Sequence, residues 1–278
     1  MPPEPLEGFL LAAGLGTRMG PLSRVLPKPA WPLGGRSLLQ WSADTFRRAG
    51  LTRLACNVHL HPERLAQAAE GIEVCPEPAL LGSAGGLRHA RGRVGEALLV
   101  WNADALGEVP WARLRAEHLA SGADLTWLLV PHPGGAWNPV FTDESGRILP
   151  LGTPSGPRGP FHFTGAAAWS PGALDRLPEG PSEVRDLLPH LAAHRALVVP
   201  PFPWREVGTP DQLIAAADAL APEAEGRLPG CYVHPTARPA GRLSRCVLGP
   251  GAAPHGAFED EGAFWFEEAG RQVRLALP

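Results

Sequence analysis

One lysine follows a glycine-rich turn near the start of the chain. Lys28 is the only lysine among the 25 lysine and arginine residues of this 278-residue sequence. It comes shortly after the apolar run 8–13 and the turn Gly14-Leu15-Gly16-Thr17-Arg18. An ammonium kept where arginine serves everywhere else indicates a site that needs a compact, mobile point charge rather than a planar fork. A strand, a glycine turn, an arginine and a lysine therefore predict a polyphosphate-binding site, and the position beside the turn favours this over a chance survivor of the arginine bias.

The turn matches neither of two common phosphate-binding patterns. Met19 stands where the dinucleotide pattern G-x-G-x-x-G needs its third glycine, and the P-loop pattern G-x-x-x-x-G-K-[ST] is absent from the sequence. The residues still suit phosphate, because Gly14 and Gly16 let backbone N–H groups turn toward its oxygens without interference from a Cβ atom. Thr17 adds a hydroxyl donor, and Arg18 adds a bidentate fork.

The wider pattern around this turn resembles the signature of the sugar-1-phosphate nucleotidyltransferases, also called NDP-sugar pyrophosphorylases. Residues 8 to 220 follow it, most closely in the short bacterial type that acts on N-acetylmuramate-1-phosphate with UTP or on mannose-1-phosphate with GTP. Phe163-Thr164-Gly165 matches the family's sugar-facing strand more weakly. The stronger matches are 11–19 with Pro21-Leu22-Ser23 and Pro27-Lys28-Pro29, then Glu77-Pro78-Ala79-Leu80-Leu81-Gly82-Ser83-Ala84-Gly85-Gly86, Val100-Trp101-Asn102-Ala103-Asp104 and Trp204-Arg205-Glu206-Val207-Gly208-Thr209-Pro210.

The resemblance implies a role for each matched residue. Arg18, Lys28 and Asp104 are expected to be catalytic, and Asp104 and Glu206 are expected to hold Mg²⁺, the implied cofactor. Asn102, Gly165 and Glu206 are expected to bind the sugar phosphate. Nucleotide binding is expected from Leu11, Ala13, Gly14, Gly16, Thr17, Arg18, Glu77, Gly82 and Ser83.

The implied reaction is nucleotidyl transfer from an NTP to a sugar-1-phosphate, which gives an NDP-sugar and pyrophosphate. A sugar-phosphate oxygen attacks the α-phosphorus in line, and such transfers depend on positioning and charge neutralisation rather than on a side-chain nucleophile. Arg18 would span the β- and γ-phosphates that leave, and Lys28 would follow the charge as the α-phosphate is attacked. Asp104, at the end of an expected parallel strand, suits Mg²⁺.

Two departures from the family pattern leave alternatives open. The usual aspartate of Trp-x-Asp-x-Gly-Thr is Glu206 here, which could bind the metal directly, bind it through water or have given up the role. The second lysine that the family often places near the sugar phosphate is missing, and its substitute could be Arg147, Arg158, Arg185 or Arg205.

These departures motivate a second hypothesis, a weak or inactive regulatory subunit of the same fold that binds a nucleotide sugar. Molybdopterin-type nucleotide transfer is a third, which the segment Trp204–Pro210 disfavours because its pattern belongs to sugar-phosphate enzymes. The sequence identifies neither the base nor the sugar.

The secondary-structure elements that must position these residues alternate between expected strands and expected helices. Over the first 130 residues they predict an α/β fold with a Rossmann-like, mostly parallel or mixed sheet flanked by helices. His59 and His61 would share one strand face, but two histidines are too few ligands for a metal site. For Glu77, a position on the surface is the alternative to contact with the nucleotide. We expect strands at 8–13, 53–58, 97–101, 124–130 and through 161–163, a turn at 143–146, and helices at 37–48, 62–70, 84–91, 111–120, 183–193 and 210–220.

Residues 1–225 are expected to form the nucleotidyltransferase domain and residues 226–278 a C-terminal β appendage, joined by a linker at 221–230. Segments 233–237 and 248–252 share an aliphatic–x–x–x–Ala spacing, and the second has the form of a left-handed β-helix hexapeptide. Two matches support only a rudimentary coil. We expect it to dock on the main domain or on another subunit of a homo-oligomer and to be dispensable for chemistry; the alternative is an irregular tail.

The composition of the chain limits the classes of partner that we expect. A net charge of −3 and a pI near 6.4 provide no basic field for nucleic acid or an anionic membrane. No apolar run reaches the roughly 18 residues that span a bilayer, and the N-terminus lacks the cationic and apolar regions of a signal peptide. The four cysteines lack CxxC pairing and fit buried thiols in a reducing compartment. We therefore expect a cytoplasmic protein. The family resemblance implies an enzyme of polysaccharide or cell-envelope precursor synthesis, whose partners are an NTP and a sugar-1-phosphate.

Overall fold

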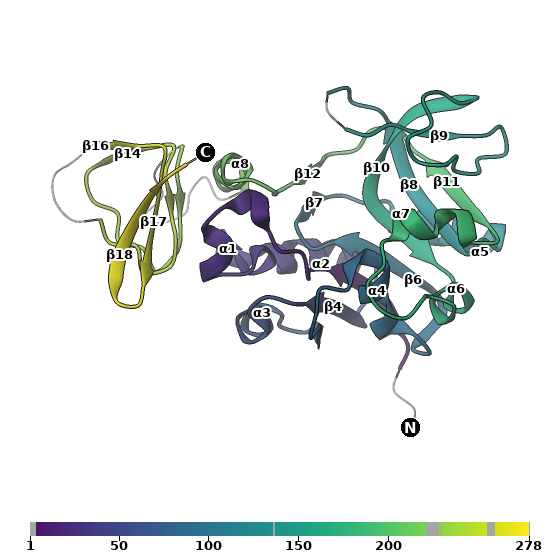
Figure 1. The fold of residues 1–278 in the computed structure, drawn as a ribbon, viewed down its shortest axis with the longest axis horizontal. Helices are drawn as coiled ribbons and strands as arrows, with labels where there is room; N and C mark the ends of the chain where they lie inside the picture. The colour runs from purple at the N-terminus through teal and green to yellow at the C-terminus, as the bar shows by residue number, and fades with distance from the viewer. Residues whose placement is uncertain (1–3, 136, 221–227, 229, 255–258, 278) are drawn as a thin grey trace. The chain divides into compact units, whose positions relative to one another are not determined.

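The chain folds into two compact units, and each is assembled from separate stretches of sequence. The computed structural model describes residues 4–135, 137–220, 228, 230–254 and 259–277 (Figure 1). The first unit comprises residues 1–14, 42–59 and 71–204, and the second comprises 15–41, 60–70 and 205–278. The signature segment is therefore shared: its strand and Gly14 belong to the first unit, and the rest of the turn belongs to the second.

The first unit is built around an eight-stranded sheet in the order β11-β8-β10-β6-β1-β4-β5, with β9 paired to β10. Strand β10 runs antiparallel to its neighbours β6, β8 and β9, and every other pair is parallel. The mixed, mostly parallel sheet confirms the predicted fold class. Its strands are β1 (Leu6–Leu11), β4 (Leu54–Val58), β5 (Glu73–Pro76), β6 (Val94–Asn102), β8 (Leu125–Pro131), β9 (Val140–Thr142), β10 (Arg158–Trp169) and β11 (His194–Val198).

Helices cover both faces of this sheet. Neighbouring residues of a strand point to opposite faces, and in β6 the two directions are occupied differently. Val100 belongs to a buried apolar cluster with residues of α4 (Gly82–Leu87) and α6 (Pro171–Asp175). The ring of Trp101 instead lies 5.9 Å from that of Trp111 in α5 (Trp111–Ser121), which in turn lies 4.4 Å from Phe46 of α2 (Leu38–Arg48). The result is a three-layer α/β/α unit (Figure 1).

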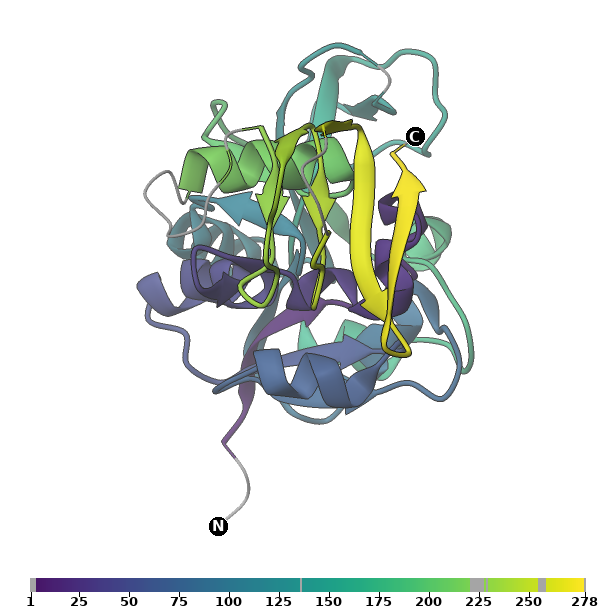
Figure 2. The same ribbon diagram turned by 90° about the vertical axis from the view of Figure 1, so that its left-hand side faces the viewer.

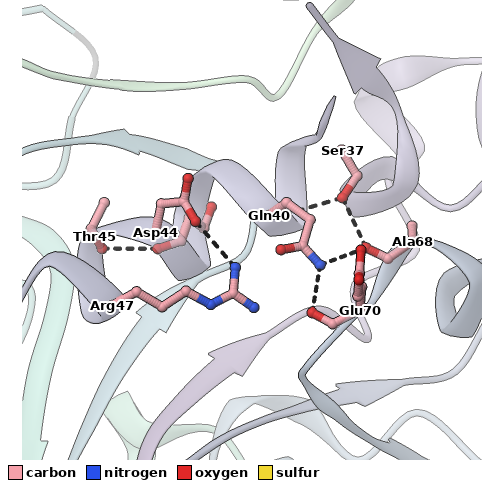
Figure 3. A network of polar contacts seen from close by, with 8 residues as sticks. Ser37, Gln40, Asp44, Thr45, Arg47, Ala68 and Glu70 are labelled. Carbon is pink, nitrogen blue, oxygen red and sulfur yellow. Dashed lines mark hydrogen bonds and ion pairs between the residues drawn. The ribbon is translucent and has the colours of Figure 1, made fainter. Parts of the chain in front are cut away.

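The second unit holds most of the signature on short elements. Met19, Leu22 and Trp31 are fully buried and anchor this segment. Ser37 accepts a hydrogen bond from the backbone N–H of Gln40 at the start of α2, and the Gln40 side chain donates to the carbonyls of residues 68 and 70 (Figure 3). These bonds join the segments 15–41 and 60–70. The elements are η1 (Thr17–Met19), α1 (Leu22–Val25), η2 (Lys28–Ala30), β2 (Pro32–Leu33), β3 (Arg36–Ser37), α3 (Pro62–Ala68) and α8 (Pro210–Leu220).

Six strands follow α8. The two longest, β17 and β18, are the neighbouring yellow arrows in Figure 2. Strands β13, β15 and β17 pair in parallel and β18 closes the sheet as an antiparallel neighbour, while β14 and β16 form a second parallel pair. A small core of buried cysteine, leucine and alanine side chains supports them. For the described residues the irregular-tail alternative is thus wrong, and the left-handed coil stays a prediction. The strands are β13 (Tyr232–Val233), β14 (Arg242–Ser244), β15 (Val247–Leu248), β16 (Glu259–Glu261), β17 (Ala263–Glu268) and β18 (Arg271–Ala276).

The C-terminal strands pack directly on the signature segment of the second unit. The Tyr232 ring meets that of Trp31 edge-on at 5.3 Å, and its hydroxyl donates to the Pro32 carbonyl at 2.8 Å. Both rings are buried. The C-terminal strands therefore support the segment that follows Lys28. The expected linker at 221–230 and the boundary at 225/226 fall largely outside the described residues.

Several local predictions need correction. Strand β4 ends at Val58 and His61 has a left-handed backbone with φ 50° before α3, so His59 and His61 do not share a strand face. The expected helix 183–193 is α7 (Val184–Leu187) followed by η4 (Leu188–His190), because Pro189 lacks the N–H that a longer helix needs. Strands β5 and β11 and helix α6 were not predicted. The four cysteines are buried thiols, as expected, and no helix in the described part of the chain could span a membrane.

Candidate active site

The carboxyl ends of β1 and β6 bring three predicted site residues to one edge of the sheet. Leu11 is paired with Asn102, and the Leu11 carbonyl accepts a hydrogen bond from the backbone N–H of Ala103 at 3.0 Å. Ala13 and Gly14 follow β1 by two and three residues, and Asp104 follows β6 by two residues. This edge is where open α/β sheets bind ligands. The first unit therefore brings Leu11, Asn102 and Asp104 to one edge of the sheet, and their roles stay predictions.

Asn102 and Gly165 are neighbours across β6 and β10. Gly165 has φ +83°, and a Cβ atom there would come within 2.8 Å of the Asn102 Nδ2 atom. The register of β10 also shifts between Phe163 and Ala167. Only glycine combines this backbone angle with so close an approach. Two of the three residues expected at the sugar phosphate are therefore adjacent.

Asp104 is a candidate ligand for a divalent cation. Its exposed fraction is 9%, and it lies in the turn between β6 and β7 (Ala105–Gly107). The Ser42 hydroxyl donates to the Ala105 carbonyl at 2.8 Å and supports this turn. No group of three or more His, Cys, Asp or Glu side chains in the described residues could enclose a metal. Mg²⁺ needs only one or two protein carboxylates when phosphate oxygens complete its shell, so Asp104 fits that requirement.

Glu77 is buried rather than solvated, so the surface alternative is wrong. Its exposed fraction is 4%, and its Oε1 atom accepts from the Asn57 Nδ2 group at 2.7 Å. Its Oε2 atom accepts from the Leu81 backbone N–H at 3.1 Å. Asn57 in turn accepts from the Ala12 N–H at 2.7 Å. One buried network thus joins the end of β1 to the loop that opens α4, and a Cβ at Gly86 would collide with it at 2.3 Å.

Ser83 is held by Glu183, a residue that the sequence analysis missed. The Glu183 Oε2 atom accepts from the Ser83 hydroxyl at 2.6 Å and from its backbone N–H at 3.2 Å. The Ser83 hydroxyl accepts in turn from the Val184 N–H at 3.0 Å. Gly82 has φ +74°, and a Cβ there would lie 2.6 Å from the Ser182 carbonyl. Residues 182–184 therefore pack against the predicted nucleotide loop, a contact that no local sequence pattern indicates because the partners are 100 residues apart.

In the second unit, the glycine turn brings the lysine segment close. Gly16 has φ +62° and its carbonyl accepts from the Met19 N–H at 2.8 Å, which forms the start of η1. A Cβ at Gly16 would lie 3.6 Å from the Lys28 Cβ. Thr17 and Arg18 are exposed while Met19 is buried. The turn therefore exposes Thr17 and Arg18, and the backbone that carries Lys28 lies close to it in the same compact unit.

Arg18 and Glu206 form an ion pair within the second unit. The Arg18 Nη2 group donates to the Glu206 Oε1 atom at 2.6 Å, and the side chains are 58% and 18% exposed. Glu206 ends β12 (Trp204–Glu206), two residues before Gly208. The two residues were expected in separate roles, and no sequence pattern indicates their contact.

A family model described as a MobA-like NTP transferase domain matches residues 8–151. A protein of Oryza sativa subsp. japonica, named as a probable mannose-1-phosphate guanylyltransferase 1, is 26% identical over 97% of this chain and 89% of its own length. The mannose-1-phosphate guanylyltransferase of Mycobacterium tuberculosis is 27% identical over 77% of this chain and 64% of its own length.

The fold also has solved counterparts. HddC from Yersinia pseudotuberculosis, crystallised in complex with GMP-PN, superposes with a TM-score of 0.65 over 77% of this chain and 99% of that chain. Its sequence is 18% identical, so the likeness concerns the fold alone.

Proposed function

The chain belongs to the family of MobA-like NTP transferase domains, among the sugar-1-phosphate nucleotidyltransferases, and we propose that it joins an NTP and a sugar-1-phosphate into an NDP-sugar with release of pyrophosphate. The observation that carries the proposal is the Gly16 turn, which presents Thr17 and Arg18 and draws the segment of Lys28 close. The two named relatives are mannose-1-phosphate guanylyltransferases, so GTP and mannose-1-phosphate are the first pair to test.

The two cationic side chains, Arg18 and Lys28, would bind different phosphates of the nucleotide. Backbone N–H groups of the turn 14–17 and the Arg18 fork bind the β- and γ-phosphates, because a fork spans two phosphate oxygens. The Lys28 ammonium neutralises charge that develops on the α-phosphate during attack, and a preorganised cation is most effective where charge appears in the transition state. Both groups act on one nucleotide because they belong to one continuous signature.

Residues at the edge of the sheet would bind the sugar-1-phosphate and the metal ion. Asn102 offers an amide to the sugar phosphate beside Gly165, whose missing side chain leaves room for that amide. Asp104 would hold the divalent cation, proposed to be Mg²⁺, which when bound neutralises phosphate charge. Gly82, Ser83 and Glu77 act on the nucleotide through the shape of their loop, since Ser83 and Glu77 bond to other residues of the first unit.

The test is a screen for pyrophosphate release with four NTPs against a panel of sugar-1-phosphates in the presence of Mg²⁺. Product from one pair supports the enzyme, and GTP with mannose-1-phosphate is the expected pair. Tight binding of a nucleotide sugar with no product from any pair would favour the regulatory-subunit hypothesis instead.

The metal assignment has its own test in the Asp104→Asn variant. It should lose most Mg²⁺-dependent turnover, because a neutral amide is a poor ligand for Mg²⁺, while it still binds nucleotide without metal. Turnover and nucleotide affinity are measured in parallel at several Mg²⁺ concentrations. Wild-type turnover at the same Mg²⁺ requirement would remove Asp104 from the metal site.

A further inference from the structure

The segment Glu206–Gly208 surrounds the Arg18 guanidinium on two sides. Glu206 holds the Nη2 group through the 2.6 Å ion pair. A Cβ atom at Gly208 would lie 2.9 Å from Arg18 Nη2, 3.0 Å from its Cζ and 3.1 Å from its Nη1. The planar guanidinium therefore rests against the bare Cα of Gly208, and a Cβ atom at this position would push it away.

The position of Gly208 is itself fixed by the start of α8. The Gln212 side chain accepts a hydrogen bond from the Gly208 N–H at 2.8 Å, and the Thr209 hydroxyl accepts from the Gln212 N–H at 3.3 Å. Both bonds satisfy backbone N–H groups at the start of α8, as helix caps do, and proline is favoured in the first turn. These bonds hold the backbone at Gly208, against which the Arg18 guanidinium lies.

We propose that Glu206 and Gly208 form a cradle that positions Arg18 for the leaving phosphates, and that Glu206 acts on the reaction through Arg18 rather than as a metal ligand. The proposal rests on the proposed function. An arginine that is free to rotate loses side-chain entropy when it binds phosphate, and holding it beforehand reduces that loss. The single bond to Glu206 leaves other guanidinium N–H groups to bind an anion, since arginine has five donors.

This role accounts for the departure from the usual aspartate. A glutamate reaches one methylene farther, and here its carboxylate meets the guanidinium at hydrogen-bond distance. An exposed ion pair of this kind contributes little to stability by itself. Its value lies in orientation, and the charge of Glu206 is already matched by Arg18 in the absence of any ligand.

Gly208→Ala tests the cradle without changing any charge. Gly208 does not have a positive φ, so alanine fits the backbone and only its Cβ displaces the guanidinium. The Kd for inorganic pyrophosphate, measured by calorimetry without divalent cations, should rise by about two- to tenfold, the range that immobilising one such side chain is worth. In an Arg18→Ala background the same substitution should have no further effect. The matched control is Gly95→Ala, whose Cβ would meet only Pro5 at 3.5 Å, and it should keep the wild-type Kd.

Variants of Glu206 separate the cradle from its alternatives. Glu206→Ala should weaken metal-free pyrophosphate binding as Gly208→Ala does, whereas Glu206→Gln retains an acceptor oxygen and should recover most of the affinity. Tighter binding by Glu206→Ala would show that the carboxylate repels the anion, which overturns the proposal. An unchanged metal-free Kd with a raised Mg²⁺ requirement would assign Glu206 to the metal and also overturn it.

A second measurement does not depend on catalysis. The rate at which phenylglyoxal modifies Arg18, followed by peptide mass mapping, should rise in Gly208→Ala and Glu206→Ala because the guanidinium is released. Unchanged rates in both variants would overturn the cradle. If the wild type neither binds pyrophosphate nor turns over any substrate pair, the proposed function fails, and the modification rates still decide whether Arg18 is held.

Discussion

Lys28 is the residue on which the proposed chemistry depends most. Lys28→Ala should lower kcat/KM by about 10²–10³, the usual effect of removing one preorganised charged donor. Lys28→Arg should restore little, because a planar fork does not replace a compact ammonium at close range. The matched control is Arg24→Ala, which removes an exposed positive charge from the same segment and should keep kcat/KM near the wild-type value. Near-normal turnover of Lys28→Ala would make the lysine an accident of composition.

The buried amide of Asn57 carries a prediction about stability. Asn57→Ala removes the acceptor of the Ala12 N–H and the donor to Glu77 in one step. Each buried polar group left without a partner costs about 1–3 kcal/mol, so the free energy of unfolding should fall by at least that amount in urea titrations. Asn57→Asp retains the acceptor but sets a carboxylate against Glu77, and it should be no more stable than the alanine variant. Wild-type stability of Asn57→Ala would show that the network contributes nothing.

Single residues also mark the limit of what the sequence could predict. The glycine turn, Asn102 and Asp104 follow from order along the chain, because strand ends and turns are local features. The contacts of Ser83 with Glu183 and of Arg18 with Glu206 join residues 100 and 188 positions apart. Their geometry depends on how the strands are ordered in space. A sequence motif can therefore identify residues such as Arg18, Ser83 and Glu206, but the fold is needed to show which residues they bond to.

At the scale of elements, α5 and β8 are joined by a buried histidine that makes the fold sensitive to acid. His118 is 1% exposed, its Nδ1 atom lies 2.9 Å from the Thr126 hydroxyl, and burial lowers its pKa to about 4. The unfolded chain binds a proton near the ordinary pKa of about 6.5, so stability is present above that pH and is lost as the pH falls toward 4. Between pH 7 and 5 the free energy of unfolding should fall by about 2 kcal/mol from this group.

Denaturant titrations at both pH values measure that loss. In His118→Asn, which has no titrating ring but retains a polar group near Thr126, the stability difference between pH 7 and 5 should shrink by the same amount. An equal pH dependence in the variant and the wild type would place the acid sensitivity elsewhere.

Elements with strong periodicity were predictable, and those without it were not. Helix α8 was predicted with its observed bounds, since Thr209-Pro210 is a clear start signal and the apolar positions repeat at helical spacing. Strand β5 is only four residues long and contains Cys75 and Pro76, so no alternating pattern reveals it. Strand β11 depends on pairing with β8, which lies nearly 70 positions earlier in the chain. Short strands of this kind are fixed by their neighbours rather than by their own residues.

For the whole molecule, the division into two units is not contiguous in sequence. The chain enters the second unit at Leu15, leaves it within α2, returns for residues 60–70 and enters it a third time at Arg205. The boundary expected from composition, at 225/226, coincides with none of these crossings and lies beyond the last of them. The C-terminal strands consequently share a compact unit with residues 15–19 of the glycine turn, which no motif in either segment indicates.

That shared unit leads to a prediction about the C-terminal strands. Tyr232 covers Trp31 and bonds to Pro32, four residues after Lys28. Tyr232→Ala should destabilise the second unit by about 3–5 kcal/mol through the cavity it leaves, while Tyr232→Phe loses only the hydroxyl bond, about 1 kcal/mol. Hydrogen exchange should quicken at residues 28–33 in the alanine variant, with β4 of the first unit as the unchanged reference. A chain ending at residue 230 should likewise lose turnover, because the lysine segment loses its support. Full kcat/KM in that shortened chain, with slow exchange retained at 28–33, would show that the strands are dispensable after all.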